Sequence, residues 1–85
     1  MGAHVVALSW NASGGATSYN VWRSTVNGAC YPTIGSSCSK IATGVTQTQY
    51  TDGTVQSAHT YFYVITAVNS FGESGPSNAA VVTIP

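Results

Sequence analysis

The sequence predicts an all-β domain in which antiparallel strands pack as a sandwich. Three observations lead to this fold class. Apolar and polar residues alternate with a period of two along much of the chain, no window repeats with the period of a helix, and Gly, Asn, Ser and Pro separate the alternating runs. A chain of 85 residues is enough for one domain. We therefore expect residues 1–85 to form a single unit, with residues 1–4 as an added start or the remnant of a first strand.

Two strands are expected in the first third of the chain. Large apolar residues at every second position from Val6 to Trp10 predict a half-buried strand. Residues 11–18 are rich in Asn, Ser, Gly and Thr and predict a turn. The alternation returns from Tyr19 to Ser24, with an aromatic residue on each face. An Asn-Gly pair, a proline and one further glycine then predict an irregular segment over residues 27–39.

Four further segments complete the predicted strand order. Lys40–Ala42 and Gln49–Thr51 are expected to form short strands, because Gly and Asp-Gly stop them soon after they begin. Tyr61–Asn69 is apolar at both odd and even positions, which indicates a central strand covered on both faces. Residues 69–78 hold two glycines and a proline and predict a long loop. Residues 80–84 are expected to form the closing strand.

The charge and the hydropathy of the chain each argue against one class of partner. Only Arg23, Lys40, Asp52 and Glu73 are formally charged, which makes 5% of the residues, against roughly 25% in an average soluble domain. Nucleic-acid binding needs clustered cations to neutralise phosphates, and two scattered cations do not supply them. The chain also has no apolar run of about 18 residues that could cross a bilayer. We expect no nucleic acid as partner and no membrane insertion.

The two cysteines, Cys30 and Cys38, predict a disulfide. A zinc site needs about four Cys or His ligands at suitable spacing, and the chain has two Cys and two His. A disulfide would imply an oxidising compartment, so an extracellular or cell-surface location, with the periplasm as another option. The alternative is a pair of free thiols in a reducing cytosol. We expect no metal and no cofactor.

The residues that carry acid–base chemistry are too few to predict an enzyme. General acid–base catalysis usually pairs two tuned groups, and the carboxylates are limited to Asp52 and Glu73. Asp52 is interpreted as an acceptor in a turn, and Glu73 as a residue of a solvated loop. The histidines, His4 and His59, would still lack two ligands if they met at a metal. We therefore predict no catalytic residues.

A set of short motifs in order resembles a known family. Val6-x-Leu8-x-Trp10, Tyr19-x-Val21-x-Arg23, Tyr50-Thr51-Asp52, the run from Thr60 to Asn69 and Gly75-Pro76-Ser77-Asn78 together resemble a fibronectin type III domain, in particular the type of bacterial extracellular proteins. The resemblance spans His4 to Pro85 and implies an immunoglobulin-like β-sandwich. Its structural core would comprise Leu8, Trp10, Tyr19, Val21, Tyr50, Tyr61, Tyr63 and Ile65.

The resemblance also implies a tyrosine corner, and the chain departs from the family pattern nearby. The hydroxyl of Tyr61 would bond to the backbone a few residues upstream, and Val55 would plug the same corner. Ala58 stands where the family usually has Gly, which would cost about 1 kcal/mol if φ is positive there. The family's first strand, strand A, is short or missing here, so the next strand, strand B at Val6–Trp10, would expose a bare edge. The segment 27–39 is longer than usual and would be pinned by the disulfide.

One surface is a candidate for binding. The outward residues of the predicted strands at Tyr19–Ser24, Tyr61–Asn69 and 80–84 would form an apolar stripe beside Asn20 and Thr66. Apolar stripes often mark contact surfaces. The alternative is that these pairs only stabilise the sheet. The loop at 70–74 lacks the Arg-Gly-Asp tripeptide of integrin ligands but presents another aromatic residue. The candidate binding face is therefore Trp22, Phe62, Val64, Val81 and Phe71.

Two functions follow from these observations. The first is a non-catalytic extracellular binding or spacer module of a larger bacterial secreted or surface protein. The alternative is a structural subunit that self-assembles into a fibre or surface array, because near-zero net charge and a bare strand edge favour association. Expected partners are a protein or polysaccharide surface, neighbouring domains or further copies of the chain.

Overall fold

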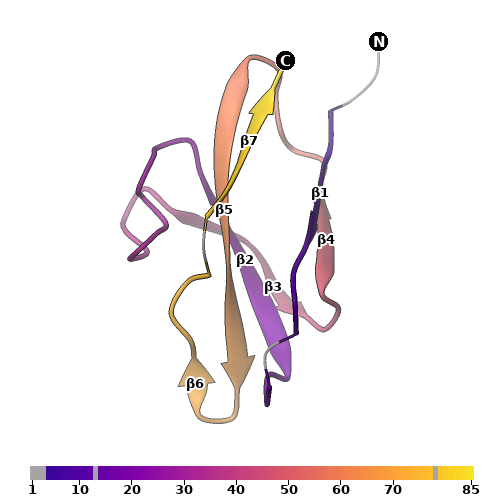
Figure 1. Ribbon diagram of the computed structural model, residues 1–85, viewed down its shortest axis with the longest axis vertical. Coiled ribbons are helices and arrows are strands. Elements are labelled where there is room, and N and C mark those ends of the chain that lie inside the picture. Colours follow the sequence, from indigo (N-terminus) through magenta and orange to yellow (C-terminus); the bar gives the residue numbers. More distant parts are fainter. Residues whose placement is uncertain (1–3, 13, 78) are drawn as a thin grey trace.

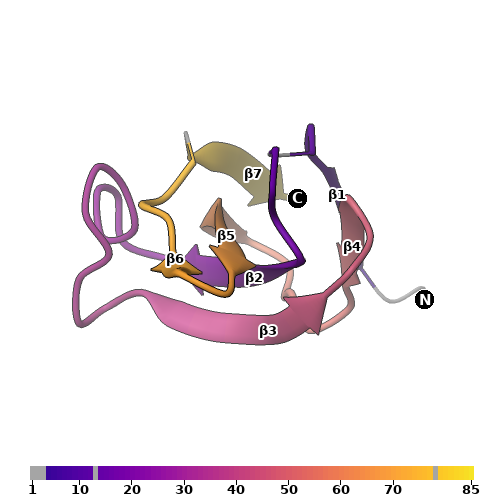
Figure 2. The same cartoon turned by 90° about the horizontal axis from the view of Figure 1, so that it is seen from below.

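The computed structural model describes residues 4–12, 14–77 and 79–85, which form strands and no helix. One layer pairs β1 (Val6–Ser9) with β4 (Gln49–Asp52). The other layer contains β3 (Ser39–Val45), β2 (Ser18–Ser24) and β5 (His59–Asn69) in that order. The short β6 (Gly72–Glu73) and the closing β7 (Ala80–Ile84) both pair with β5. All pairs are antiparallel, and the two layers face each other as a sandwich (Figures 1 and 2).

The six strands expected from the alternation are all present, with shifted ends. β3 runs from Ser39 to Val45 and is longer than the predicted Lys40–Ala42, because it pairs with β2 from Tyr19 to Arg23. β5 is central, as its two apolar faces indicated, since β2 pairs with one edge and β6 and β7 with the other.

The predicted long loop over residues 69–78 is wrong. Asn69 pairs with Gly72, so β5 turns into β6 through two residues, Ser70 and Phe71. Gly72 has a φ of +138°, a conformation that side chains rarely adopt. Past β6 the chain stays beside β5, because the Ser74 nitrogen donates to the Ala67 carbonyl at 2.8 Å and the Ser77 nitrogen to the Ile65 carbonyl at 2.9 Å. β6 and β7 are thus two parts of one interrupted edge.

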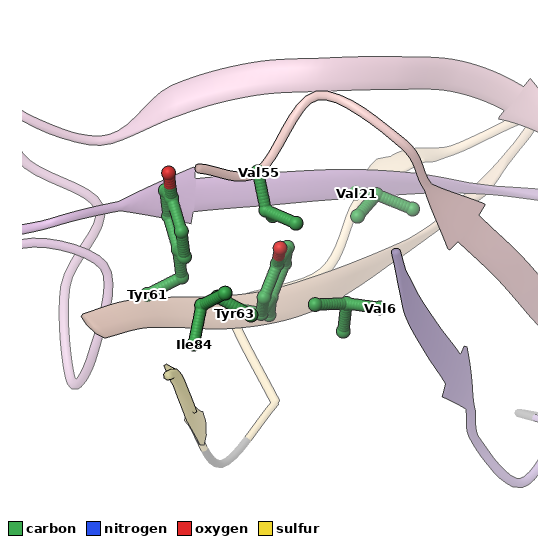
Figure 3. Close-up of a cluster of buried hydrophobic side chains, with 6 residues drawn as sticks. All are labelled: Val6, Val21, Val55, Tyr61, Tyr63 and Ile84. Atoms are coloured by element: carbon green, nitrogen blue, oxygen red, sulfur yellow. The ribbon is translucent and has the colours of Figure 1, made fainter. Parts of the chain in front are cut away.

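The core lies between the layers. Six buried side chains gather there from both sheets and from the corner between β4 and β5 (Figure 3). They are Val6, Val21, Val55, Tyr61, Tyr63 and Ile84. Of the core residues named from the sequence, Tyr19, Val21, Tyr61 and Tyr63 are buried, and Leu8, Trp10, Tyr50 and Ile65 are partly buried. The Trp10 ring meets the Tyr19 ring edge-on, with centroids 5.6 Å apart.

The corner between β4 and β5 has the form that the resemblance implied. The Gln56 nitrogen donates to the Tyr61 hydroxyl at 2.8 Å, and Val55 is buried. Ala58 has a φ of +62°, so the position does take the left-handed conformation that glycine tolerates best. Residues 1–3, where the remnant of a first strand was expected, lie outside the described residues, and among the described residues β1 pairs with β4 alone.

Candidate functional site

Cys30 and Cys38 form the predicted disulfide, with Cα atoms 5.2 Å apart. Both residues are buried, because the segment that they close folds back over the outer face of the β2–β5 sheet. There the two cysteines pack with Val64, and Trp22, Ala29, Ile34 and Ala79 surround them. The insertion is therefore a second, smaller apolar cluster on the outside of the sandwich.

This cluster corrects the expected binding stripe. Register places Trp22 opposite Val64 and Phe62 opposite Val81, so the four residues share the outer face. Val64, however, is only 1% exposed, because the disulfide-closed segment covers it. Trp22 and Phe62 are partly buried, and Val81 is 60% exposed. The stripe is interrupted at its centre, and Val64 does not offer a surface to a partner.

Beyond the stripe, the outer face carries a polar network centred on Glu73. Asn20 donates through Nδ2 to Glu73 Oε2 at 2.9 Å, and the Thr66 hydroxyl donates to the same oxygen. Trp22 Nε1 donates to Thr66 Oγ1 at 3.0 Å, and the Thr43 hydroxyl to Asn20 Oδ1 at 2.7 Å. These hydrogen bonds, from Thr66 first and then Asn20, lower the pKa of Glu73. Glu73 is thus a strand residue that fastens β6 to the sheet, which corrects its assignment to a solvated loop.

The other carboxylate, Asp52, lies in the core. It accepts the Thr54 nitrogen at 2.9 Å, which confirms the turn acceptor. It also accepts Arg23 Nη1 at 2.9 Å and the Tyr63 hydroxyl at 2.8 Å. Burial raises the pKa of Asp52, but the hydrogen bonds from Thr54, Tyr63 and Arg23 outweigh it and lower the pKa to about 2. The Asp52 carboxylate is 2% exposed and is already hydrogen-bonded to three residues, so a substrate cannot reach it.

The remaining titratable groups are dispersed in the described part of the chain. His59 Nδ1 lies 2.8 Å from the Ser57 carbonyl oxygen, and His4 is exposed. Over residues 4–12, 14–77 and 79–85, no three His, Cys, Asp or Glu side chains gather in a way that could hold a metal. The same residues contain no helix long and apolar enough to span a membrane.

The turn between β5 and β6 presents Phe71, which is 97% exposed. The Phe71 nitrogen donates to Asn69 Oδ1 at 2.8 Å, so the turn is closed by a side chain. A hollow of about 340 Å³ lies between this hairpin and residues 14–16. A second hollow of about 150 Å³ lies between Trp10 and residues 74–77. Both are lined by Ala67 and Ser74, and we call the pair the hairpin groove.

The sequence singled out Phe71 but not the hairpin groove. The groove forms because the turn after β1 and the segment after β6 lie at the same end of the sandwich (Figure 2). Period-two alternation carries no information on how two turns meet, so no signal in the sequence reveals it.

Comparison with known proteins supplies relatives for the chain, although no family model matches it. It is 46% identical over 77 residues to an amylopullulanase of Thermoanaerobacterium thermosulfurigenes, covering 89% of the chain and 4% of that protein. It is 39% identical over 80 residues to an amylopullulanase of Thermoanaerobacterium saccharolyticum, covering 94% and 6%. It is 42% identical over 79 residues to a poly(3-hydroxybutyrate) depolymerase of Ralstonia pickettii, covering 92% and 13%. The chain therefore spans a small part of each relative.

Two solved structures share the fold. The chain superposes on a twitchin kinase region from C. elegans with a TM-score of 0.74 at 29% identity, over 98% of the chain and 14% of that structure. It superposes on an Fn3-like protein from Clostridium thermocellum with a TM-score of 0.81 at 40% identity, over 98% of the chain and 79% of that protein. With this identity over most of both chains, the present chain belongs to the fibronectin type III family.

Proposed function

We propose that the chain is a non-catalytic module of a larger extracellular bacterial enzyme that degrades a polymer. The observation that carries this proposal is the small share of each relative's length that the chain covers. The chain matches the relatives over about nine-tenths of itself, yet it spans only 4% of one amylopullulanase and 13% of the depolymerase. A unit that recurs as a small part of long enzymes supports a role beside the catalytic part.

The chemistry of the relatives supports the same conclusion. An amylopullulanase cleaves glycosidic bonds, and a poly(3-hydroxybutyrate) depolymerase cleaves ester bonds. These reactions need different constellations of residues, which supports a non-catalytic role for a segment common to both enzymes. Asp52 agrees with this, since its carboxylate is held in the core by Arg23 and Tyr63.

An extracellular location is supported by the disulfide. Cys30 and Cys38 are bonded, and disulfides persist in oxidising compartments. Intact mass measured with and without reductant checks this on the protein recovered from culture medium. We expect a gain of two hydrogens on reduction, and the same mass in both samples would remove this support.

The test of the proposal uses the complete reading frame that encodes the chain. Its product and a version lacking residues 4–85 are compared on granular starch, on soluble maltooligosaccharides and on poly(3-hydroxybutyrate) particles. We expect the deletion to lower the rate on one insoluble polymer and to leave the rate on a soluble substrate of the same enzyme unchanged. The isolated chain should release no product from any of them. Turnover by the isolated chain, or a frame that encodes no catalytic part, would overturn the proposal.

A second candidate function, self-assembly, is favoured by the edge of β1. Among the described residues β1 pairs with β4 alone, and Val5 beside it is 59% exposed. Unpaired edges can add a strand from another chain. Sedimentation velocity over a hundred-fold range of concentration tests this, and a monomer throughout would exclude it.

A further inference from the structure

We infer that the hairpin groove binds a segment of neutral α-glucan, with the ring of Phe71 stacked against a sugar ring. This inference rests on the proposed function, because it takes its ligand class from the amylopullulanases among the relatives. It goes further by assigning the contact to one end of the sandwich and to named residues.

The backbone of the turn that carries Phe71 is held in place before any ligand arrives. Single apolar side chains are common on protein surfaces, so exposure alone says little. Here the turn is closed by the hydrogen bond from the Phe71 nitrogen to Asn69 Oδ1. Behind the turn, the Ala67 nitrogen donates to Ser74 Oγ at 2.9 Å, and the Ser74 nitrogen donates to the Ala67 carbonyl at 2.8 Å. A turn with a fixed backbone loses little backbone entropy on binding, which raises affinity.

The opposite side of the hairpin is clamped as well. Thr17 donates to the Val68 carbonyl through its nitrogen at 2.8 Å and through its hydroxyl at 3.0 Å. The Glu73 carboxylate accepts from Asn20 and Thr66 on the outer face of the sheet. The hairpin is therefore fixed from both sides, while its most exposed residue makes no apolar contact within the described core clusters.

The groove has the composition of a site for a neutral polyol. Its two hollows run from Phe71 at one end to Trp10 at the other, with the small side chain of Ala67 common to both. Asn11 lines the second hollow, and Asn69 lines the first. Among the described residues, neither Nδ2 group donates a hydrogen bond, so both can donate to sugar hydroxyls. Apolar walls with a few polar groups are typical of ligand sites.

The charge of the chain selects against ionic ligands. Glu73 is the one charged residue among the described residues that line the groove, and its Oε2 atom is already bonded on the sheet. With two cations and two anions in the whole chain, no electrostatic field would attract a charged polymer. A glucan is uncharged, which suits a groove with little charge, and its C–H faces can stack on the aromatic ring of Phe71.

The groove also lies where a polymer can reach it. Ile84 pairs with the first residue of β5, and Gly72 pairs with the last. These 11 residues place the C-terminal end and the Phe71 turn about 33 Å apart, at opposite ends of the molecule (Figure 1). The groove is therefore not covered by the C-terminal end of the described domain.

The experiment is affinity electrophoresis of the chain in native gels that contain pullulan or amylopectin. We expect both glucans to retard the chain, and Phe71→Ala to weaken the apparent affinity about ten-fold, as loss of one stacked aromatic implies. Phe71→Trp should restore binding, and Asn11→Ala should weaken it. The matched control is Val81→Ala, which removes an apolar side chain 60% exposed outside the groove. Thermal unfolding confirms that each variant is folded.

Two outcomes would overturn the inference. They are no retardation of the wild type by either glucan, and equal retardation of the wild type and Phe71→Ala. Neither of these bears on the module proposed above, which is judged by deleting residues 4–85 from the full product. If the chain binds no glucan but its deletion still slows polymer degradation, the inference about the hairpin groove fails and the proposed module function stands.

Discussion

Arg23 and Asp52 form an ion pair that joins the two sheets of the sandwich. Arg23 lies on β2 and Asp52 ends β4, and the nitrogen and oxygen are 2.9 Å apart. The guanidinium carbon lies 5.1 Å from the centre of the Tyr61 ring, and the Tyr63 hydroxyl donates to the same carboxylate oxygen. Burial first, and then the bond to Asp52, raise the pKa of Tyr63 well above its usual range. The ion pair is therefore packed against Tyr61 and hydrogen-bonded to Tyr63, two tyrosines of the core.

The ion pair predicts how stability depends on pH. The pKa of Asp52 is about 2 in the folded chain, against 3.8 for the free group. The unfolded chain thus takes up the proton first, so the stabilisation is complete above pH 3.8 and is lost as the pH falls towards 2. We expect a loss of about 2 kcal/mol, measured as the free energy of unfolding in urea from pH 7 to pH 2.

Asp52→Asn is the control for this dependence. It removes the charge but keeps the side-chain size, so the variant should be less stable at pH 7 by about 3 kcal/mol, because Arg23 loses its partner. Its acid dependence should shrink to the contribution of Glu73, whose pKa is also lowered. An Asp52→Asn curve parallel to that of the wild type would show that another group carries the acid dependence.

Ala58→Gly should stabilise the fold. Ala58 has a φ of +62°, where a Cβ atom costs about 1 kcal/mol that glycine does not incur. A gain of this size would raise the melting temperature by about 4–8 °C in a domain of this length. The matched control is Ala7→Gly in β1, an exposed strand position where glycine should destabilise. If both substitutions lowered the melting temperature, the strain at Ala58 would be absent.

The strands could be predicted because each is a local pattern, whereas most of the site depends on contacts between distant segments. Tyr61–Asn69 was placed centrally from its two apolar faces, and β5 is central. Nothing local, however, pairs Arg23 with Asp52, which lie 29 residues apart. Val64 was predicted to point outward, and its position in β5 does place it on the outer face. The segment closed by the Cys30–Cys38 disulfide covers it there.

The errors at the β5–β6 hairpin have a related cause. Glycine, serine and proline over residues 69–78 indicate that the chain turns. They do not indicate that the segment is hydrogen-bonded to a neighbouring strand. The Ser74 and Ser77 hydroxyls accept from the Ala67 and Ile65 nitrogens of β5, so polar residues do there what a regular strand would do. A segment that bonds to a strand edge through serine side chains has the amino-acid composition of a loop. The sequence therefore did not lead us to expect β6.

Tyr61→Phe should cost about 1–3 kcal/mol, because it leaves the Gln56 nitrogen without its acceptor while the ring stays in the core. Tyr50→Phe is the matched control, since Tyr50 is partly buried in the same core and its hydroxyl has no hydrogen bond among the described residues. Urea unfolding of the two variants measures the difference. Equal costs would mean that the corner hydrogen bond contributes nothing to stability.

Replacing Cys30 and Cys38 together by alanine should uncover the outer face of the sheet. Loss of the cross-link costs about 2.5 kcal/mol through the entropy of the unfolded chain. Because the bonded cysteines also cover Val64, the variant should bind more of a dye specific for apolar surface at pH 7 than the oxidised wild type.

Reduced wild type is the control for the disulfide variant. Its thiols can still pack against Val64, so it should lose the cross-link energy and bind less dye than the double-alanine variant. The comparison separates the covalent contribution from the packing of the insertion, since only the double variant loses both. If neither protein bound more dye than the oxidised chain, the insertion would hold its place without the disulfide, and the cover over Val64 would depend on Ala29, Ile34 and Ala79.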